Sequence, residues 1–271
     1  MGDGPEFFEE LGLNLKNYFL LATPTAFISQ FVLFIVFIIT RKNVIVDMGW
    51  AINHFLIGLV LATDLFKGFG HHPERNVVSF LMLTFWFLRL GGFLFYYRIF
   101  KAHSDKRYEG LTAGDSETKV ILKYLFQYIL QGMLVLITAL PLRWSLDPIR
   151  TEISFTQIIG WIIIPIALGF ELVADLQLQK YKDSGVRGGI FQEGLWKKSR
   201  HPNLFFELCV WFGITLTGIN SPNHLVAFIG PIFLWAIMNF LTIPVTEEYM
   251  KKTRSQWPEY EESTNKFLPF L

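Results

Sequence analysis

Residues 193–207 hold the densest group of side chains that could do chemistry, and they lie at the edge of an apolar stretch. A fixed cation, a titratable ring, an amide and a carboxylic acid follow one another there, namely Arg200, His201, Asn203 and Glu207. Pro202 suits the first turn of a helix, where its missing N–H does no harm. The free N–H groups of such a turn favour an anionic ligand, such as a phosphate or a carboxylate. This mixture favours a ligand site over the alternative, a basic connection that touches only lipid headgroups.

Charged side chains also occur inside apolar stretches, where each one costs at least about 2.5 kcal/mol and calls for a partner or a function. Glu171 and Asp175 are four residues apart and therefore share one face of a helix. Asp47 and Arg89 lie in two other stretches, and they can either pair across neighbouring helices or bind a ligand. His54 fits a structural role in which its ring is hydrogen-bonded.

The composition indicates which kind of element positions these groups. Of the 271 residues, 52% are hydrophobic and only 17% are charged, whereas about a quarter are charged in soluble domains. The 28 phenylalanines carry more apolar surface than a soluble core of this length can bury. Backbone groups inside a bilayer must hydrogen-bond within their own segment, so the apolar stretches are helices. We therefore predict an all-α polytopic membrane protein.

Apolar stretches near the ~20 residues that cross hydrocarbon recur along the whole chain. They are predicted at 18–40, 44–66, 77–97, 124–142, 153–178, 203–219 and 223–245. The chain is thus expected to form one domain of about seven transmembrane helices, residues 18–245, which includes a polar connection at 179–202. An acidic amphipathic segment, residues 1–17, precedes this domain, and a basic, polar tail, residues 246–271, follows it.

The distribution of charge gives an orientation and excludes some functions. Most Lys and Arg residues fall on the side of the alternating spans that carries the C-terminal tail. The positive-inside rule places this side in the cytoplasm, or in the matrix if the membrane is mitochondrial. The net charge of +1 gives no reason to expect a nucleic acid partner. The single cysteine excludes an internal disulfide, and no metal site is expected.

Motifs in several spans follow one family pattern. The stretch around Arg200 reads Gly-Leu-Trp-x-x-Ser-Arg-His-Pro-Asn-x-x-x-Glu at 194–207. Earlier stretches read Asp-Met-Gly-Trp at 47–50, Phe-Leu-Arg-Leu at 87–90 and Phe-Glu-Leu-Val-Ala-Asp-Leu-Gln at 170–177. The tail adds Glu247-Glu248, Tyr260 and Thr-Asn-Lys-Phe-Leu-Pro at 264–269. In this order the motifs resemble the steroid 5α-reductase superfamily, and within it the uncharacterised branch with a 5α-reductase-like C-terminus.

The resemblance implies a membrane-embedded reductase that holds NADPH between its helices and reduces an activated C=C bond in a lipid or isoprenoid. By motif, seven residues would line the dinucleotide cavity: Arg89, Asp175, Arg200, His201, Asn203, Glu207 and Glu248. Asn203 would lie near the nicotinamide, and Arg200 near a phosphate, whose oxygens match a guanidinium group. The connection 179–202 would lie on the cofactor side.

Two departures from the family pattern bear on activity. The family continues Arg-His-Pro-Asn with Tyr-Phe-Gly-Glu, whereas Leu204, Phe205 and Phe206 precede Glu207 here. The change removes a hydroxyl group and puts a large ring where glycine allows close approach. The proton-donating Glu and Tyr of the 5α-reductases have no clear counterpart, and Asp47 and Trp86 are the nearest catalytic candidates. Reduction of a steroid 4-ene is therefore not expected.

Two other functions stay open. A reductase-like chain with a degenerate cavity could be an accessory subunit of a larger membrane complex that holds structural lipid. Isoprenylcysteine methyltransferases share the Arg-His-Pro motif and a Glu-Glu tail, but the motifs at 47–50, 87–90 and 170–177 favour the reductase. S-adenosylmethionine is accordingly not expected as a cofactor. The endoplasmic reticulum is the usual eukaryotic location of the family, and nothing in residues 1–17 excludes the mitochondrial inner membrane.

Overall fold

The chain is a bundle of long helices, as the sequence predicts. The computed structural model describes residues 4–63, 73–102, 112, 114–147, 153–186 and 188–269, and in these ranges every regular element is helical. The elements are α1 (Gly4–Thr40), α2 (Ile45–Leu61), α4 (Pro73–Leu94), η1 (Phe95–Ala102), α6 (Glu117–Thr138), α7 (Leu142–Ser145), α8 (Phe155–Asp183), η2 (Gly194–Lys197), α9 (Pro202–Gly218), η3 (Pro222–Phe228), α10 (Ile229–Ile237), η4 (Met238–Thr242), α11 (Ile243–Thr253) and α12 (Trp257–Ser263). The all-α class is therefore confirmed.

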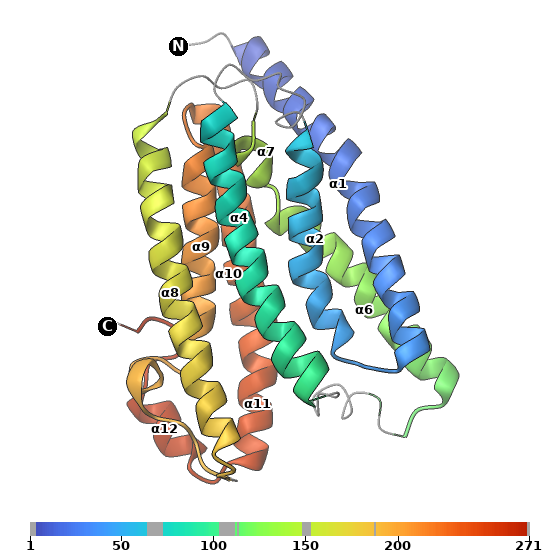
Figure 1. Ribbon diagram of the computed structural model, residues 1–271, viewed down its shortest axis with the longest axis vertical. Helices are drawn as coiled ribbons and strands as arrows, with labels where there is room; N and C mark the ends of the chain where they lie inside the picture. Colours follow the sequence, from blue (N-terminus) through green and yellow to red (C-terminus); the bar gives the residue numbers. More distant parts are fainter. Residues whose placement is uncertain are drawn as a thin grey trace.

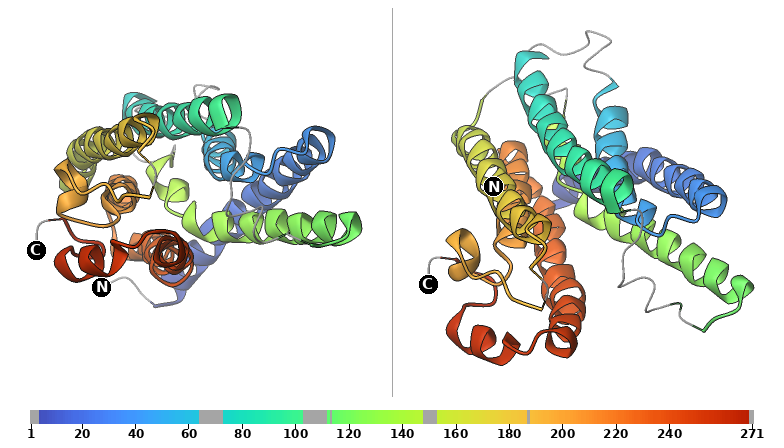
Figure 2. Two further views of the ribbon diagram at one scale, coloured as in Figure 1. Left: turned by 90° about the horizontal axis from the view of Figure 1, so that it is seen from below. Right: turned by 60° about the horizontal axis from the view of Figure 1, so that its bottom comes forward.

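The long helices alternate in direction along the bundle (Figure 1). The helices α1, α4 and α8 and the segment from α10 to α11 run toward the end that carries α12, while α2, α6 and α9 run back. Toward this end, α1 and α6 lean away from α8 and α11 (Figures 1 and 2). The connection between α1 and α2, the segment between α8 and α9, and α12 therefore gather at one end of the molecule.

Five segments of the described residues are long and apolar enough to cross a membrane: Phe8–Thr40, Asn76–Lys101, Glu117–Thr138, Phe155–Asp183 and Pro222–Thr253. Helices α2 and α9 each have 17 residues, which is the lower end of the length that spans hydrocarbon. The count of seven spans thus stays a prediction, although helices occur in all seven predicted stretches. Helix α1 runs unbroken from Gly4, so residues 4–17 continue directly into the first span.

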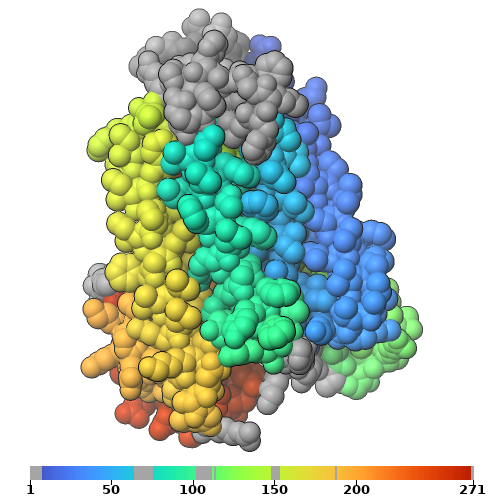
Figure 3. All heavy atoms as spheres, in the orientation of Figure 1, coloured from blue at the N-terminus to red at the C-terminus, as the bar shows by residue number. Residues whose placement is uncertain are grey.

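The outer surface of the bundle is rich in large apolar side chains. Phe155 and Ile162 on α8 and Phe85 on α4 are all more than half exposed, and α4 and α8 form much of the face seen in Figure 3. Soluble monomers rarely expose such broad apolar patches. Together with the five long apolar segments, this surface identifies an integral membrane protein.

Aromatic and polar groups share the centre of the bundle. The rings of Trp86 and Trp211 meet edge to face with centroids 5.2 Å apart, and His54 lies against both. His54 is fully buried, and its Nδ1 and Nε2 atoms lie 2.8 and 2.9 Å from the Trp50 carbonyl oxygen and Thr138 Oγ1. With both ring nitrogens engaged, this histidine has the structural role that the sequence predicts.

Helices α8 and α9 approach closely through facing glycines. A Cβ atom on Gly160 would lie 2.5 Å from the carbonyl oxygen of Gly213, and one on Gly213 would lie 2.7 Å from a side-chain carbon of Ile164. Small residues allow this backbone approach between membrane helices. The close contact brings the polar residues of α8 next to those at the start of α9.

We expect Gly160→Ala to destabilise the protein, because its new methyl group would meet a backbone oxygen that cannot move aside. Overpacking of this kind costs roughly 1–3 kcal/mol. The matched control is Gly169→Ala on the same helix, where no atom lies within 4 Å of the added Cβ. Thermal unfolding in detergent should show a melting temperature several degrees lower for Gly160→Ala only. Equal melting temperatures for the two variants would contradict the close packing.

Candidate functional site

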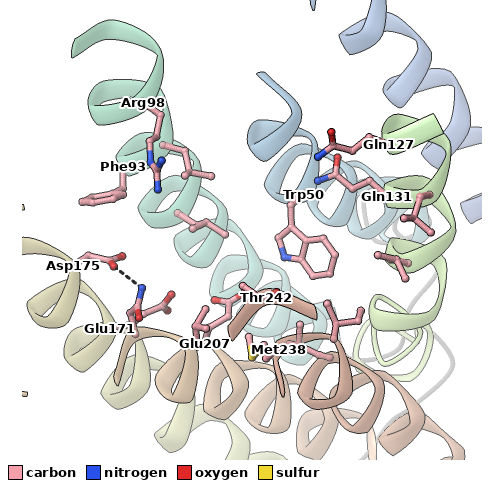
Figure 4. Close-up of a pocket in the computed structure, with 18 residues that line it drawn as sticks. Trp50, Phe93, Arg98, Gln127, Gln131, Glu171, Asp175, Glu207, Met238 and Thr242 are labelled. Atoms are coloured by element: carbon pink, nitrogen blue, oxygen red, sulfur yellow. Dashed lines mark hydrogen bonds between the residues drawn. The ribbon is translucent and has the colours of Figure 1, made fainter. Parts of the chain in front are cut away.

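A cavity of about 400 Å³ lies among α2, α4, α6, α8, α9 and α10 (Figure 4). One wall is acidic and comes from α8 and α9, with Glu171, Asp175 and Glu207 beside Asn203. Two amides from α6, those of Gln127 and Gln131, lie on the opposite wall. Arg98 and Thr242 also contribute, and the remaining lining is apolar: Trp50, Leu90, Phe93, Leu94, Leu130, Leu134, Leu204, Leu234, Ile237 and Met238. A ligand that fits must therefore combine an apolar body with polar groups at two ends.

The acidic wall is held by Arg89 of α4. Its guanidinium group forms ion pairs with both Glu171 and Asp175, and its side chain is only 8% exposed. The two acids share the helix face that the sequence predicts, but Arg89 pairs with them instead of with Asp47. A buried charge needs such partners, because the membrane interior offers no water to solvate it. Arg89 thus lies directly behind the cavity wall and does not itself line the cavity.

Hydrogen bonds fix the α9 part of the same wall. Asn203 Nδ2 donates to Asp175 Oδ1 at 3.1 Å, as the dashed line in Figure 4 shows. The indole N–H groups of Trp86 and Trp211 donate to the two oxygens of Glu207 at 2.8 and 3.1 Å. All these polar groups therefore have set positions before any ligand binds, which is the condition for precise recognition.

The charges of this wall are unequal. Arg89 forms ion pairs with two of the three acids, Glu171 and Asp175, whereas Glu207 accepts hydrogen bonds from two indole N–H groups. Glu171 Oε2 is buried and has no hydrogen-bond donor when all carboxyl groups are ionised, and its neighbour is the carboxyl group of Glu207. A proton held between these two carboxyl groups would satisfy this oxygen and reduce the excess negative charge.

Loss of the Arg89 cation should destabilise the bundle. Arg89→Leu leaves two buried carboxylates without a counter-ion, a change that costs roughly 3–5 kcal/mol. The control is the triple variant Arg89→Leu, Glu171→Gln, Asp175→Asn, which removes the charges together and should recover most of the folded protein. Yield of monodisperse protein in detergent and the melting temperature measure both effects. A single Arg89→Leu variant as stable as the unmodified protein would contradict the assigned ion pairs.

Arg200 and His201 lie outside the cavity, in a buried contact with Glu247 of α11. Arg200 Nε donates to Glu247 Oε1 at 2.9 Å, and His201 Nε2 lies 3.0 Å from the same oxygen. Arg200 also donates from Nη1 to the carbonyl oxygens of Glu261 and Thr264, at 2.7 and 3.0 Å. The guanidinium group that the sequence assigns to a phosphate is therefore engaged within the chain.

The C-terminal segment completes this contact. The backbone N–H of Arg200 donates to the Asn265 carbonyl at 2.8 Å, and Ser199 Oγ donates to the Phe267 carbonyl at 2.9 Å. The Tyr260 hydroxyl group donates to the Trp196 carbonyl at 2.6 Å, and burial raises the pKa of this phenol, so it stays a neutral donor. We call Arg200, His201, Glu247 and residues 260–267 the tail clasp.

The other predicted residues lie apart from the cavity. Glu248 is next to Glu247 in sequence, but its side chain is 61% exposed and pairs with Lys252 at 2.9 Å. Asp47 is in the first turn of α2, and Trp86 touches Glu207 from behind the wall. Of the predicted set, the structure thus brings Asp175, Asn203 and Glu207 to the cavity, with Arg89 and Trp86 supporting them.

The tail clasp predicts different roles for two adjacent acids. Glu247→Gln keeps the side-chain shape but removes the charge that faces Arg200 and His201, so the tail should detach more often. We expect trypsin to cleave after Lys266 several times faster in this variant. Glu248→Gln is the matched control and should be cleaved at the unmodified rate, because its side chain is exposed. Equal rates for both variants would show that Glu247 does not hold the tail.

The sequence analysis did not predict several of the lining residues, although the spacing of two of them could have indicated the site. Gln127 and Gln131 stand four residues apart in an apolar stretch, the spacing that singled out Glu171 and Asp175. Trp50 belongs to the Asp-Met-Gly-Trp motif at 47–50, which carries it without placing it at a cavity. Arg98 carries no comparable signal, because single basic residues are common near span ends. Polar side chains with helical spacing inside a span therefore identify both walls of the cavity.

The residues that depart from the family pattern leave the cavity open. Leu204 lines it, so this part of the wall is apolar. Phe206 is only 5% exposed and stacks on Phe170 of α8, with centroids 5.0 Å apart and rings inclined by 13°. Phe206 is not a lining residue. The ring that replaces the family's glycine packs between the helices and does not close the cavity.

Comparison with known proteins shows the family of the chain. The family described as "Protein of unknown function (DUF1295)" matches residues 33–267, which include every lining residue of the cavity. The chain belongs to this family. DUF1295 is part of the steroid 5α-reductase-like group. No curated protein and no solved structure matches the chain.

Proposed function

We propose that this DUF1295 protein is an NADPH-dependent reductase that acts on a C=C bond of a membrane lipid or isoprenoid. The observation that supports the proposal most strongly is the convergence of Asp175, Asn203 and Glu207 on one wall of a cavity within the membrane helices. These are cofactor-site positions implied by the 5α-reductase motifs. A cavity with a few fixed polar groups and an apolar lining is the usual form of a small-molecule site.

The polar groups of the acidic wall suit one end of the dinucleotide. A nicotinamide carries a carboxamide group, and carboxyl groups such as Asp175 and Glu207 can accept its N–H donors. The cavity volume of about 400 Å³ is at the low end of the ~300–1,000 Å³ of ligand pockets, so the adenosine end would extend outside. Arg98 is the cation of the lining, and it would contact the phosphates.

The protein's own residues would orient the reactants and exclude water. When bound, NADPH supplies the hydride, and the apolar side chains of α4, α6 and α10 keep the reacting carbon atoms dry. Saturation of the double bond also consumes one proton. Glu171 and Glu207 lie on the cavity wall, so a proton held between them is placed to reach the substrate. Glu171 and Glu207 would thus donate the proton that a Glu and a Tyr donate in the 5α-reductases.

One observation favours an accessory role as the second candidate. Arg200 and His201 are committed to the tail clasp, so the guanidinium group that the motif assigns to a phosphate lies outside the cavity. A chain of this kind could retain the cavity for a structural lipid within a larger membrane complex. The C-terminal side would then face the cytoplasm or the mitochondrial matrix, as the positive-inside rule predicts.

Measurement of NADPH binding separates the two candidates. We expect purified protein in lipid nanodiscs to bind NADPH, with Asn203→Leu weakening the affinity about tenfold, the effect of one lost hydrogen bond of ~1.4 kcal/mol. The matched control is Asn239→Leu on η4, whose side chain bonds to the Trp235 carbonyl and does not line the cavity. Absence of NADPH binding by the unmodified protein would refute the reductase and leave the accessory role.

A further inference from the structure

The wall opposite the acids carries two amides with unused hydrogen-bonding groups. Gln127 and Gln131 are one helical turn apart on α6, and Figure 4 shows both pointing into the cavity above Trp50. Among the described residues, the amide of Gln127 and the Nε2 atom of Gln131 make no hydrogen bond. Polar groups inside a membrane bundle are normally paired, so amides left open toward a cavity indicate a ligand.

Gln131 is held in a fixed position by its neighbours. Gln30 Nε2 of α1 donates to Gln131 Oε1 at 2.9 Å. This bond uses the amide oxygen of Gln131 and leaves its N–H groups available to a ligand. The two side chains pack on Gly49 of α2, where a Cβ atom would lie 2.6 Å from Gln131 Oε1 and 2.9 Å from Gln30 Oε1. Three helices therefore combine to aim the amide nitrogen of Gln131.

The surroundings define which ligand group these amides can bind. An amide N–H donates to a neutral oxygen acceptor, but it does not neutralise an anion. The facing wall holds Glu171, Asp175 and Glu207, and these acids disfavour a carboxylate beside the amides. Arg98, the cation of the lining, is assigned to the dinucleotide phosphates under the proposed function. Leu130 and Leu134 flank the amides on the same helix and suit a hydrocarbon chain.

We propose that Gln127 and Gln131 form an amide clamp that binds the uncharged carbonyl or hydroxyl oxygen of a long-chain lipid. Gln131 donates one hydrogen bond with its orientation set by Gln30, and Gln127 donates a second. The clamp selects neutral lipids against acidic lipids of the same length. Its identification as the substrate end of the cavity rests on the proposed reductase function, whereas the lipid preference itself does not.

The test compares binding of a long-chain methyl ketone and the fatty acid of equal chain length to protein in nanodiscs. We expect the ketone to bind at least about tenfold more tightly, and Gln127→Leu and Gln131→Leu each to weaken ketone binding about tenfold. Gln127→Leu removes an amide without internal partners, so it serves if Gln131→Leu fails to fold. Gln179→Leu is the control, since Gln179 on α8 does not line the cavity and its side chain donates to Asp183 within the same helix.

Two results would overturn the clamp: equal binding of ketone and fatty acid, or full ketone binding by both clamp variants. NADPH affinity, measured on the same samples, should stay unchanged in Gln127→Leu and Gln131→Leu. Protein that binds no NADPH but keeps the ketone preference would refute the reductase function and uphold the clamp. Protein that binds NADPH but does not prefer the ketone would refute the clamp and leave the reductase function standing.

Discussion

A guanidinium group in the middle of a membrane helix must be neutralised where it lies, and the position of Arg89 imposes this requirement on the whole bundle. The ion pairs with Glu171 and Asp175 join α4 to α8. From Asp175 the network continues to Asn203 of α9, and Trp86 joins α4 to Glu207. One buried cation thereby fixes three helices, and the polar side chains that remain form one wall of a cavity.

The cavity is consequently asymmetric, and this asymmetry governs what can bind. The wall from α8 and α9 is acidic and rigid, whereas the wall from α6 offers neutral amide donors. Between them lies an apolar space that suits a hydrocarbon chain or a planar ring. A dinucleotide carboxamide on the acidic side and a neutral lipid oxygen on the amide side would use both walls. A purely structural lipid needs only the apolar part, and it would make no use of the amide donors of α6.

The sequence predicted which residues share a helix face and which charges need a partner. It predicted fewer of the contacts between helices. The i, i+4 spacing of Glu171 and Asp175 gave their common face, and the cost of a buried charge showed that Arg89 needed partners. The sequence could not predict which acids pair with Arg89, because it does not show which spans are neighbours. Asp47 was therefore also a possible partner. Asp175, Asn203 and Glu207 reach one cavity, as the motifs imply.

The Arg-His-Pro-Asn motif shows the limit of prediction from local sequence patterns. Its four residues surround the first turn of α9, so Arg200 and Asn203 point to different surroundings although they are close in sequence. Glu247 and the segment 260–267 fold back onto Arg200, a long-range contact without any local signal. The helices and their faces therefore follow from local patterns, whereas the tail clasp depends on tertiary packing.

The most direct test of the reductase function is a density map of the protein extracted gently from its native membrane with NADPH present. We predict density for the nicotinamide beside Asp175, Asn203 and Glu207, and a lipid oxygen beside Gln127 and Gln131. A cavity that holds only lipid, in a chain embedded within a larger assembly, would contradict the reductase and show that the fold serves as a scaffold.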